Sequence, residues 1–347
     1  MRFYTQQHRH YCGIDLHARS LYVCILDSAG EVLFHRQLPC DREKLLAALQ
    51  PYREDLAVAV ECLFCWYWVA DLCEAEGFTF VLGHALYMKA IHGGKSKNDR
   101  IDSLKIAALL RGGNLPQAYV YPGKLRATRD LLRRRLHFAR KRGELLAHIQ
   151  NTNTQYNLQP LEQRAGKTKE RGGIIEHFDD EIVQMSIATD VALLGHYDEV
   201  IREVELYMLH EVRQDHKAGF FLLRTIPGIG EILALTLLYE IHDISRFPRV
   251  QNFLSYACLV KGTHESAGKK KKLSGGKMGN LHLKWALSEA AALFLRGNTT
   301  GRKFFDRLER KHGKGKALSI LAAKLGRAVY YILQRRTPFD LQRFVTP

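Results

Sequence analysis

The stretch Leu56-Ala57-Val58-Ala59-Val60-Glu61 is almost entirely apolar and ends in an acidic residue. A short apolar run of this kind indicates a strand that is buried on both faces, as the central strands of α/β sheets are. Glu61 then falls at the end of the strand, which is where such sheets place their ligand chemistry. The run therefore predicts an α/β fold with an acidic residue at one edge of its sheet.

The residues before this run predict three further strands. Residues 11–17 indicate a strand with Asp15 near its end, and residues 21–26 indicate a second strand. A turn at residues 27–30 leads into a third strand at 31–38. Asp41 is expected to cap a helix that continues to about residue 52.

The residues after the run complete the unit. They predict a helix to about Glu76, a strand at residues 78–82 and a helix that opens at Asp99. Three strands in a meander, followed by helix, strand, helix, strand and helix, is the order of a ribonuclease-H-like α/β fold.

The start of this last helix carries two carboxylates, Asp99 and Asp102, and their spacing places both on one face. Acids in a first helical turn are favoured by the helix dipole, so a capped surface helix explains them without any function. The neighbouring bases Lys95, Lys97 and Arg100 favour a different interpretation, a divalent cation that holds a phosphate.

Such a cation needs more acidic ligands than one helix supplies. Asp15 and Glu61 lie at the predicted strand ends, and a single acid at such a place is usually exposed and without function. Asp15, Glu61, Asp99 and Asp102 together form a set that can hold one or two Mg²⁺ ions against a phosphodiester.

Composition and charge restrict the class of partner. The chain has 347 residues and a formal net charge of +16, which favours a polyanion. A membrane surface is the competing explanation, but no apolar run has the length of a spanning helix, and the N-terminus lacks a signal-peptide core. Nucleic acid is the better match. The seven cysteines form no disulfide pattern, and Cys62 and Cys65 lack a second pair at zinc spacing, so we expect a reduced, cytoplasmic protein.

Two long helical regions are expected in the middle of the chain. Residues 125–156 carry regularly spaced leucines among many arginines, and residues 180–223 show heptad-like apolar spacing. The regions are predicted to pair as an antiparallel coiled coil or to form a dimer interface, and a plain helical linker fits equally well. Arg133 and Arg134 belong to a basic cluster that either contacts phosphates or keeps the helix in solution, and the high total charge favours contact.

The C-terminal third opens with a helix–hairpin–helix pattern. An apolar helix, the turn Pro227-Gly228-Ile229-Gly230 and a second apolar helix leave backbone N–H groups free to hold a phosphate, although a tight helix–helix turn is the alternative. Four consecutive lysines follow, Lys269, Lys270, Lys271 and Lys272, which predict a solvated loop or a patch that clamps DNA. Helices are expected at 280–295, 303–311 and 317–335, and Pro338 is expected to prevent any further helix.

These pieces, taken in order, resemble one known family. The chain is similar to the DEDD-type insertion-sequence transposases that act as bridge-RNA-guided serine recombinases and are related to the Piv-type DNA invertases. The resemblance covers almost the whole chain and rests on Gly13-Ile14-Asp15, Val60-Glu61, Asn98-Asp99-Arg100-Ile101-Asp102, Ile226-Pro227-Gly228-Ile229-Gly230, Tyr256-Ala257 with Leu259, Glu265-Ser266 and Pro338-Phe339-Asp340.

The resemblance implies a specific chemistry. A RuvC-like domain at residues 1–115 would bind Mg²⁺ through Asp15, Glu61, Asp99 and Asp102, a coiled-coil linker would occupy 116–218, and a transposase domain at 219–347 would carry the nucleophile Ser266. Ala267 stands between this serine and Gly268, where the family has Ser-Gly.

The implied partners are donor and target DNA, a structured guide RNA and further copies of the chain in a dimer or tetramer. No membrane partner is implied. The setting would be the nucleoid of a bacterium or archaeon.

Two other functions remain open at this point. A Mg²⁺-dependent endonuclease or Holliday-junction resolvase-like enzyme would use only the four acids, to activate water. A nucleic-acid scaffold would leave those acids inert.

Overall fold

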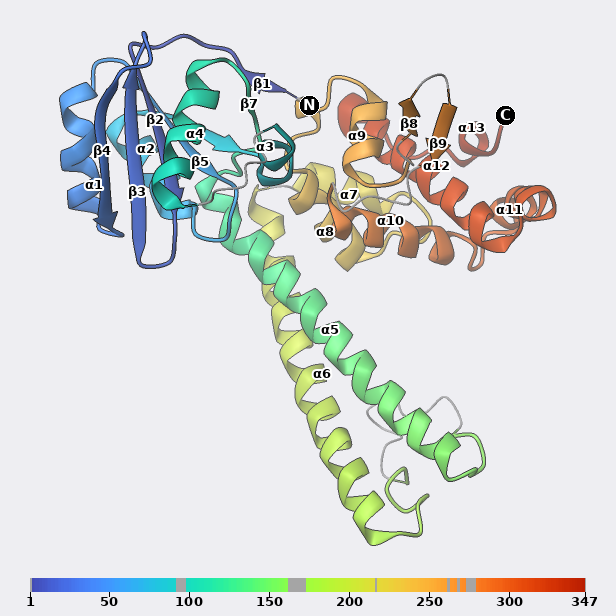
Figure 1. The fold of residues 1–347 in the computed structure, drawn as a ribbon. Coiled ribbons are helices and arrows are strands. Elements are labelled where there is room, and N and C mark those ends of the chain that lie inside the picture. Colours follow the sequence, from blue (N-terminus) through green and yellow to red (C-terminus); the bar gives the residue numbers. More distant parts are fainter. Residues whose placement is uncertain are drawn as a thin grey trace. The chain divides into compact units, whose positions relative to one another are not determined.

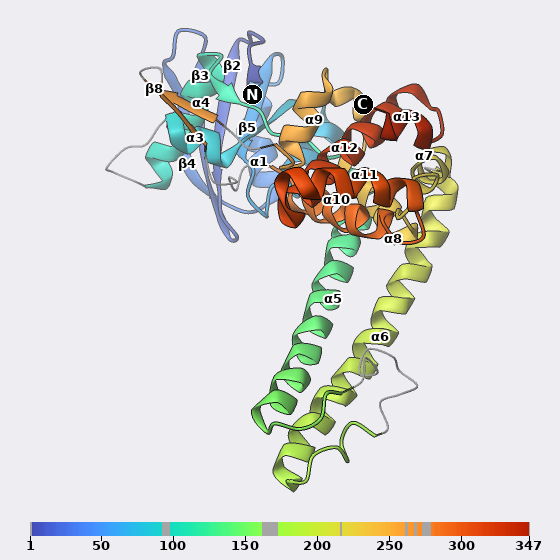
Figure 2. The same cartoon turned by 90° about the vertical axis from the view of Figure 1, so that its right-hand side faces the viewer.

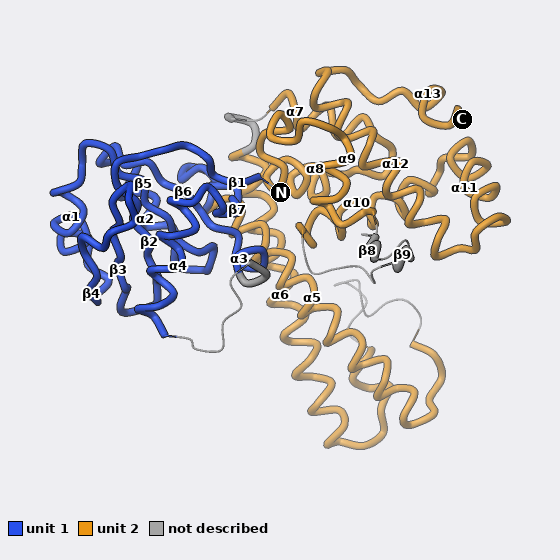
Figure 3. Tube along the Cα trace, turned by 45° about the horizontal axis from the view of Figure 1, so that its top comes forward, with its two compact units in different colours: residues 1–126 blue, residues 127–347 orange. Residues whose placement is uncertain are grey.

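The computed structural model describes residues 2–91, 98–161, 173–215, 217–260, 263–266, 269–272 and 279–346, without the side chains of 89–91, 212–215, 263–266 and 269–272. The chain divides into two compact units, Met1–Arg126 and Ala127–Pro347, which Figure 3 shows in different colours.

The first unit is built on a five-stranded sheet with the strand order β4-β3-β2-β5-β6 (Figure 1). The strands β2, β3 and β4 form an antiparallel meander, and β2, β5 and β6 run parallel to one another. Asp27 shapes the turn between β3 and β4, because its carboxylate accepts the backbone N–H groups of Gly30 and Glu31. The bounds are β2 (His10–Leu16), β3 (Ser20–Asp27), β4 (Val32–Pro39), β5 (Leu56–Glu61) and β6 (Thr79–Gly83).

Helices cover both faces of this sheet. Val58 and Val60 of β5 lie in one apolar cluster with residues of α1 and α2, whereas Ala57 and Ala59 lie in another with residues of α4. The alternation along β5 therefore divides the core into two layers, one on each face of the strand. The bounds are α1 (Arg42–Leu49), α2 (Tyr67–Glu76), α3 (Ala85–Ile91) and α4 (Asp99–Arg111).

The structure confirms the predicted mixed α/β unit, with small differences at its edges. The helix expected to reach residue 52 ends at Leu49 and continues as a 3₁₀ turn, Gln50–Tyr52, where Pro51 interrupts the α-helical hydrogen bonding. The short helix α3 was not predicted. A small antiparallel pair, β1 (Phe3–Tyr4) with β7 (Leu115–Pro116), was not predicted either, because pairing between distant two-residue strands has no local pattern.

Two long helices dominate the middle of the chain, α5 (Gly123–Gln155) and α6 (Glu181–Asp215). They lie side by side in both Figure 1 and Figure 2. Ion pairs join Arg135 to Glu205 and Arg142 to Asp198, so the partner number falls as the helix number rises, and the pair is antiparallel. The two helical regions predicted in the middle of the chain therefore lie antiparallel to each other. Apolar side chains such as Ile149, Ile187 and Leu194 pack against one another between the two helices, beyond the Arg142–Asp198 ion pair.

The remaining elements are mostly helical, and α8, α10 and α12 form their centre. Two expectations were wrong here. The helix α13 follows Pro338, because the side chain of Asp340 accepts the backbone N–H of Arg343 and starts a new helix after the proline. The basic segment, predicted as a solvated loop or as a patch that clamps DNA, contains two paired strands, β8 and β9, so the loop was wrong and the patch stays a prediction. The bounds are α7 (Lys217–Arg224), α8 (Glu231–Ile241), α9 (Val250–Tyr256), β8 (Thr263–Ser266), β9 (Lys269–Lys272), α10 (Leu281–Phe294), α11 (Thr299–His312), α12 (Lys314–Arg335) and α13 (Leu341–Val345).

No helix within the described ranges is both long and apolar enough to cross a bilayer. All seven cysteines are free thiols.

Candidate active site

The acids of the first unit come from two neighbouring strands and one helix. Asp15 is the last residue but one of β2 and Glu61 ends β5, and the preceding residues Ile14 and Val60 are partners in the parallel ladder. Tyr11, Ala57 and Ala59 pack in the cluster that contains α4, so the two-residue period places Asp15 and Glu61 on the α4 face of the sheet. Both acids therefore lie at the carboxyl ends of their strands and on the face of the sheet that α4 covers.

The helix α4 supplies the other two acids because it approaches β2 very closely. An ideal Cβ built on Gly13 would lie 2.3 Å from both the backbone N of Ala107 and the backbone O of Ser103, so only glycine fits at this position. Asn98 caps the helix by accepting the N–H of Ile101, which fixes where its first turn begins. Asp99 and Asp102 lie in that first turn.

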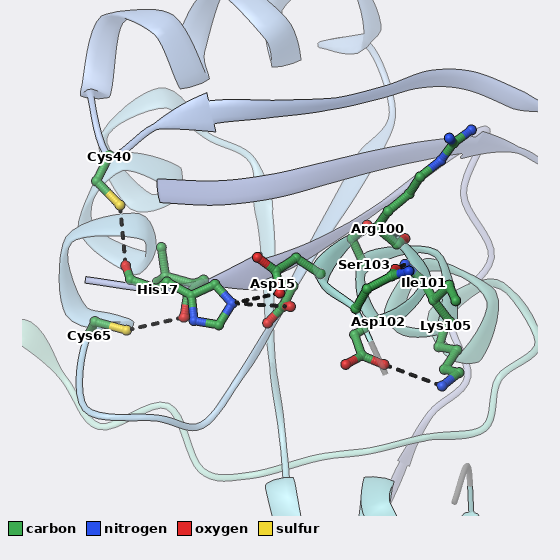
Figure 4. Close-up of polar contacts among 12 residues, drawn as sticks. Asp15, His17, Cys40, Cys65, Arg100, Ile101, Asp102, Ser103 and Lys105 are labelled. Atoms are coloured by element: carbon green, nitrogen blue, oxygen red, sulfur yellow. Dashed lines mark hydrogen bonds and ion pairs between the residues drawn. The ribbon is translucent and has the colours of Figure 1, made fainter. Parts of the chain in front are cut away.

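A histidine lies between two of these acids. The Nε2 atom of His17 is 3.4 Å from an Oδ atom of Asp15 (Figure 4). The same Nε2 atom is 3.4 Å from an Oδ atom of Asp99. Asp15 is only 7% exposed, whereas His17 and Asp99 are each about half exposed. One ligand atom from each of the three residues lies within 4.8 Å of the other two, which is close enough to bind one metal ion.

Electrostatics at Asp15 favour a bound cation. Burial raises the pKa of Asp15, and the negative charges of Asp99 and Asp102 raise it further, while His17 acts in the opposite direction. The carboxylate is therefore held where its negative charge is poorly compensated. A divalent cation beside it would remove this cost.

The other two predicted acids are not part of this three-residue group. Asp102 follows Asp99 by three residues in the first turn of α4, and its Oδ1 is 3.3 Å from Nζ of Lys105 (Figure 4). Its charge acts on Asp15, as the raised pKa of Asp15 indicates. Glu61 is partly exposed at the end of the neighbouring strand. His17 was missed from the sequence, although it stands two residues after Asp15 and so on the same side of an extended chain.

The predicted residues of the second unit divide into two groups. Ser266 ends β8 and pairs in register with Lys269 of β9, but the side chains of Ser266, Lys269, Lys270, Lys271 and Lys272 lie outside the described part of the structure. Gly228 has a φ of +84°, and an ideal Cβ on it would be 2.4 Å from the backbone N of Phe294, so α10 packs directly on this turn. Gly230 precedes α8 as its N-cap and has open space around it.

The two predicted arginines differ in their surroundings. Arg133 donates two hydrogen bonds to Glu240, of 2.6 and 2.8 Å, so its guanidinium already has a carboxylate partner. Arg134 is exposed, and its guanidinium carbon lies 4.7 Å from the ring centre of Phe138. Of the two, Arg134 is the better placed to meet a phosphate.

Comparison with known sequences identifies the family. Residues 221–306 match the family described as Transposase IS116/IS110/IS902, and residues 12–158 match the DEDD transposase family of IS110 elements. The chain belongs to the IS116/IS110/IS902 family of transposases. The transposase is therefore an enzyme that cuts and rejoins DNA.

Similar proteins support this assignment. The transposase is 23% identical to the transposase for insertion sequence element IS1111A of Coxiella burnetii, over 94% of this chain and 90% of that protein. It is 36% identical to the pilin gene-inverting protein of Moraxella bovis, over 36% of this chain and 39% of that protein. It is 27% identical to the putative transposase y4qE of Sinorhizobium fredii, over 62% of this chain and 53% of that protein.

The candidate site residues fall inside the matched regions. The predicted acids Asp15, Glu61, Asp99 and Asp102 lie in the DEDD match together with His17, and Gly228, Gly230 and Ser266 lie in the other match.

Proposed function

We propose that the transposase cuts and rejoins DNA through a covalent phosphoserine on Ser266, and that Asp15, Glu61, Asp99 and Asp102 hold Mg²⁺ beside the reacting phosphate. The observation that supports the proposal most directly is that His17 contacts both buried Asp15 and Asp99 at the end of β2. The strand order of the first unit fits a ribonuclease-H-like, RuvC-type domain.

The donor set suits a divalent cation. Carboxylate oxygens are the ligands that Mg²⁺ prefers, and the raised pKa of Asp15, caused first by burial, marks a carboxylate that gains from a nearby positive charge. When bound, the cation would polarise the scissile phosphate and offset the charge that builds on its oxygens. His17 is an additional candidate ligand, and it would add an imidazole nitrogen to the carboxylate oxygens of the acids.

The serine step conserves bond energy. The hydroxyl oxygen of Ser266 attacks the phosphorus, one phosphorus–oxygen bond to deoxyribose breaks, the serine proton passes to a base, and a free DNA hydroxyl leaves. Rejoining reverses the step, because a DNA hydroxyl attacks the phosphoserine and releases the serine. No nucleotide hydrolysis is needed. Positive charge from Lys269, Lys270, Lys271 and Lys272 would favour binding of the phosphates.

The remaining parts of the proposal concern partners and organisation. A net charge of +16 supports binding of donor DNA, target DNA and a structured guide RNA. We propose a dimer or tetramer and the three-part division at 1–115, 116–218 and 219–347, with Gly228, Gly230, Arg133 and Arg134 among the contacts to nucleic acid. A cytoplasmic, nucleoid-associated setting in a bacterium or archaeon is part of the same proposal.

The experiment is a trap for the covalent product. Labelled element-end DNA is incubated with the protein, with and without RNA transcribed from the noncoding DNA that flanks the gene, and is run on a denaturing gel. We expect a slow, protease-sensitive band that requires the RNA and disappears in Ser266→Ala. The control Ser255→Ala, on the exposed face of α9, should retain the band.

The main alternative predicts a different gel. An endonuclease or junction resolvase that activates water would give cleaved DNA with no attached protein, and Ser266→Ala would cleave normally. That result would overturn the phosphoserine mechanism. Loss of cleavage in Asp15→Asn under both schemes would exclude a scaffold with inert acids.

A further inference from the structure

A basic groove lies between the outer face of α12 and the segment that contains α13. The groove is a cavity of about 590 Å³, and four cationic side chains line it. The only acid in the lining is Asp340, whose carboxylate accepts the backbone N–H of Arg343 and starts α13. The cations in this α12–α13 groove are Lys324, Arg327, Arg335 and Arg343.

The spacing on α12 gathers a tyrosine and two arginines on one face. Arg327, Tyr331 and Arg335 follow one another at intervals of four residues, which aligns them along the helix. All three are exposed, and Tyr331 keeps 37% of its surface accessible. The guanidinium carbon of Arg335 lies 4.6 Å from the ring centre of Tyr331, so two flat groups stand together at the groove.

The three arginines of the groove lack ion pairs in the described part of the chain. Within the described ranges, no carboxylate lies at ion-pair distance from Arg327, Arg335 or Arg343, in contrast to Arg302 of α11, which pairs with Asp306 at 2.9 Å. Uncompensated arginines beside a concave surface are typical of phosphate recognition, because the guanidinium presents several donors at once.

Lys324, the fourth cation of the groove, lies beside two aromatic rings. The Nζ atom of Lys324 lies 4.5 Å from the ring centre of Phe304 and 5.2 Å from that of Phe344. Burial lowers the pKa of Lys324, and the charge of Arg307 lowers it further. An anion in the groove would relieve both effects.

We propose that the α12–α13 groove binds an unpaired segment of nucleic acid, with phosphodiester oxygens on Arg327, Arg335 and Arg343 and one base stacked on Tyr331. A duplex keeps its base faces stacked inside, so only an unpaired strand offers a base to an aromatic ring. The cavity volume is that of a small-ligand pocket and fits one nucleotide. The helix α12 begins after the last residue matched by either family, and the proposal does not depend on Ser266.

The test uses a local optical signal in the full-length protein, because other basic surfaces will also bind oligonucleotides. Tyr331→Trp adds one tryptophan to the three native ones. We expect short oligodeoxythymidylate and oligouridylate to quench the added emission, and the two arms show whether DNA or RNA is preferred. The control Tyr207→Trp, at an exposed site on α6, should not respond. Unchanged emission of Tyr331→Trp at saturating oligonucleotide would overturn the proposal.

Binding measured by anisotropy of labelled oligonucleotide supplies the second readout. Tyr331→Ala should weaken single-strand binding about tenfold, the usual loss for one stacked base, whereas Tyr331→Phe should bind normally. Arg327→Gln and Arg343→Gln should each reduce the slope of log affinity against log salt by about one, and Arg302→Gln should leave the slope unchanged. Equal losses for single strands and for a matched duplex would contradict the stacking role.

Discussion

At the scale of single residues, His17 changes what the acidic site can bind. Its Nε2 lies 3.4 Å from both Asp15 and Asp99, so this nitrogen and the two carboxylates could be ligands of one cation. Mg²⁺ takes oxygen ligands, whereas imidazole nitrogen suits transition metals better. A site with two carboxylates and one imidazole is therefore expected to accept Mn²⁺ readily as well as Mg²⁺.

This expectation can be checked without measuring activity. Mn²⁺ bound to the full-length protein should show nitrogen modulation in electron spin echo spectra, because the imidazole coordinates the ion directly. His17→Gln should remove the modulation and weaken Mn²⁺ binding about tenfold or more. His35→Gln is the matched control, since His35 contacts the start of α4 through Arg100 and Ser103 but no acid of the site. A wild-type spectrum free of nitrogen modulation would rule out His17 as a ligand.

At the scale of secondary-structure elements, the contact between β2 and α4 builds the site. Gly13 allows the backbone of α4 to lie against the strand, and this contact holds Asp99 near Asp15. The first turn of α4 is fixed by Asn98, whose side chain accepts the N–H of Ile101 at 2.8 Å. A small residue and a helix cap therefore determine the geometry of the acids.

Gly13→Ala should separate these two elements. Its Cβ would overlap backbone atoms of Ala107 and Ser103, which cannot rotate away, so we expect a loss of about 1–3 kcal/mol in unfolding free energy and weaker Mn²⁺ binding. Gly143→Ala is the control, and it should change the unfolding free energy in the opposite direction. Gly143 lies inside α5 with open space around it, so alanine there should stabilise the protein by up to about 1 kcal/mol. Urea unfolding followed by circular dichroism measures both.

At the scale of the whole molecule, buried polar contacts hold together elements that are far apart in the sequence. Glu240 of α8 is almost fully buried, and it accepts hydrogen bonds from Arg133 of α5 and from Asn280, the N-cap of α10. Burial alone would raise the pKa of Glu240, but the hydrogen bonds and charge of Arg133 outweigh it and hold this pKa below its usual value. The backbone N–H of Asn280 also donates to the carbonyl of Tyr256 at the end of α9.

Removing this carboxylate should destabilise the second unit strongly. Glu240→Ala leaves Arg133 and Asn280 without their partner, and we expect a loss of about 2–4 kcal/mol at neutral pH, seen as a lower melting temperature. Asp306→Asn, which breaks the exposed pair with Arg302, should leave the melting temperature nearly unchanged.

The pH dependence of the same contact follows from the lowered pKa of Glu240. The stabilisation is fully present above the ordinary glutamate value of 4.5 and is lost as the pH falls through the lowered value in the folded protein. The difference between wild type and Glu240→Ala should therefore shrink in acid. A difference that stays constant below that range would show that the carboxylate's charge contributes nothing.

Local sequence patterns predicted most of the secondary-structure elements but not the tertiary contacts between them. The apolar run at Leu56–Glu61, the cap at Asp41 and the apolar spacing of the long helices were predicted because each depends on neighbouring residues alone. The helix α13 differs from the expectation because the cap at Asp340, two residues after Pro338, starts a new helix. His17 was missed for a different reason, because its partner Asp99 comes from a distant element.

Periodicity, capping and charge in the amino-acid sequence were enough to predict the main strands and helices of the first unit, the acids near the strand ends and the basic character of the transposase. Three features appear only when the chain is folded. His17 joins Asp15 to Asp99, and Arg133 is bound to a buried carboxylate. Arg327, Tyr331 and Arg335 line a groove beside α13. The physical reason is packing. Contacts between distant segments depend on how closely backbones approach, and one residue without a side chain, Gly13, sets that distance at the acidic site.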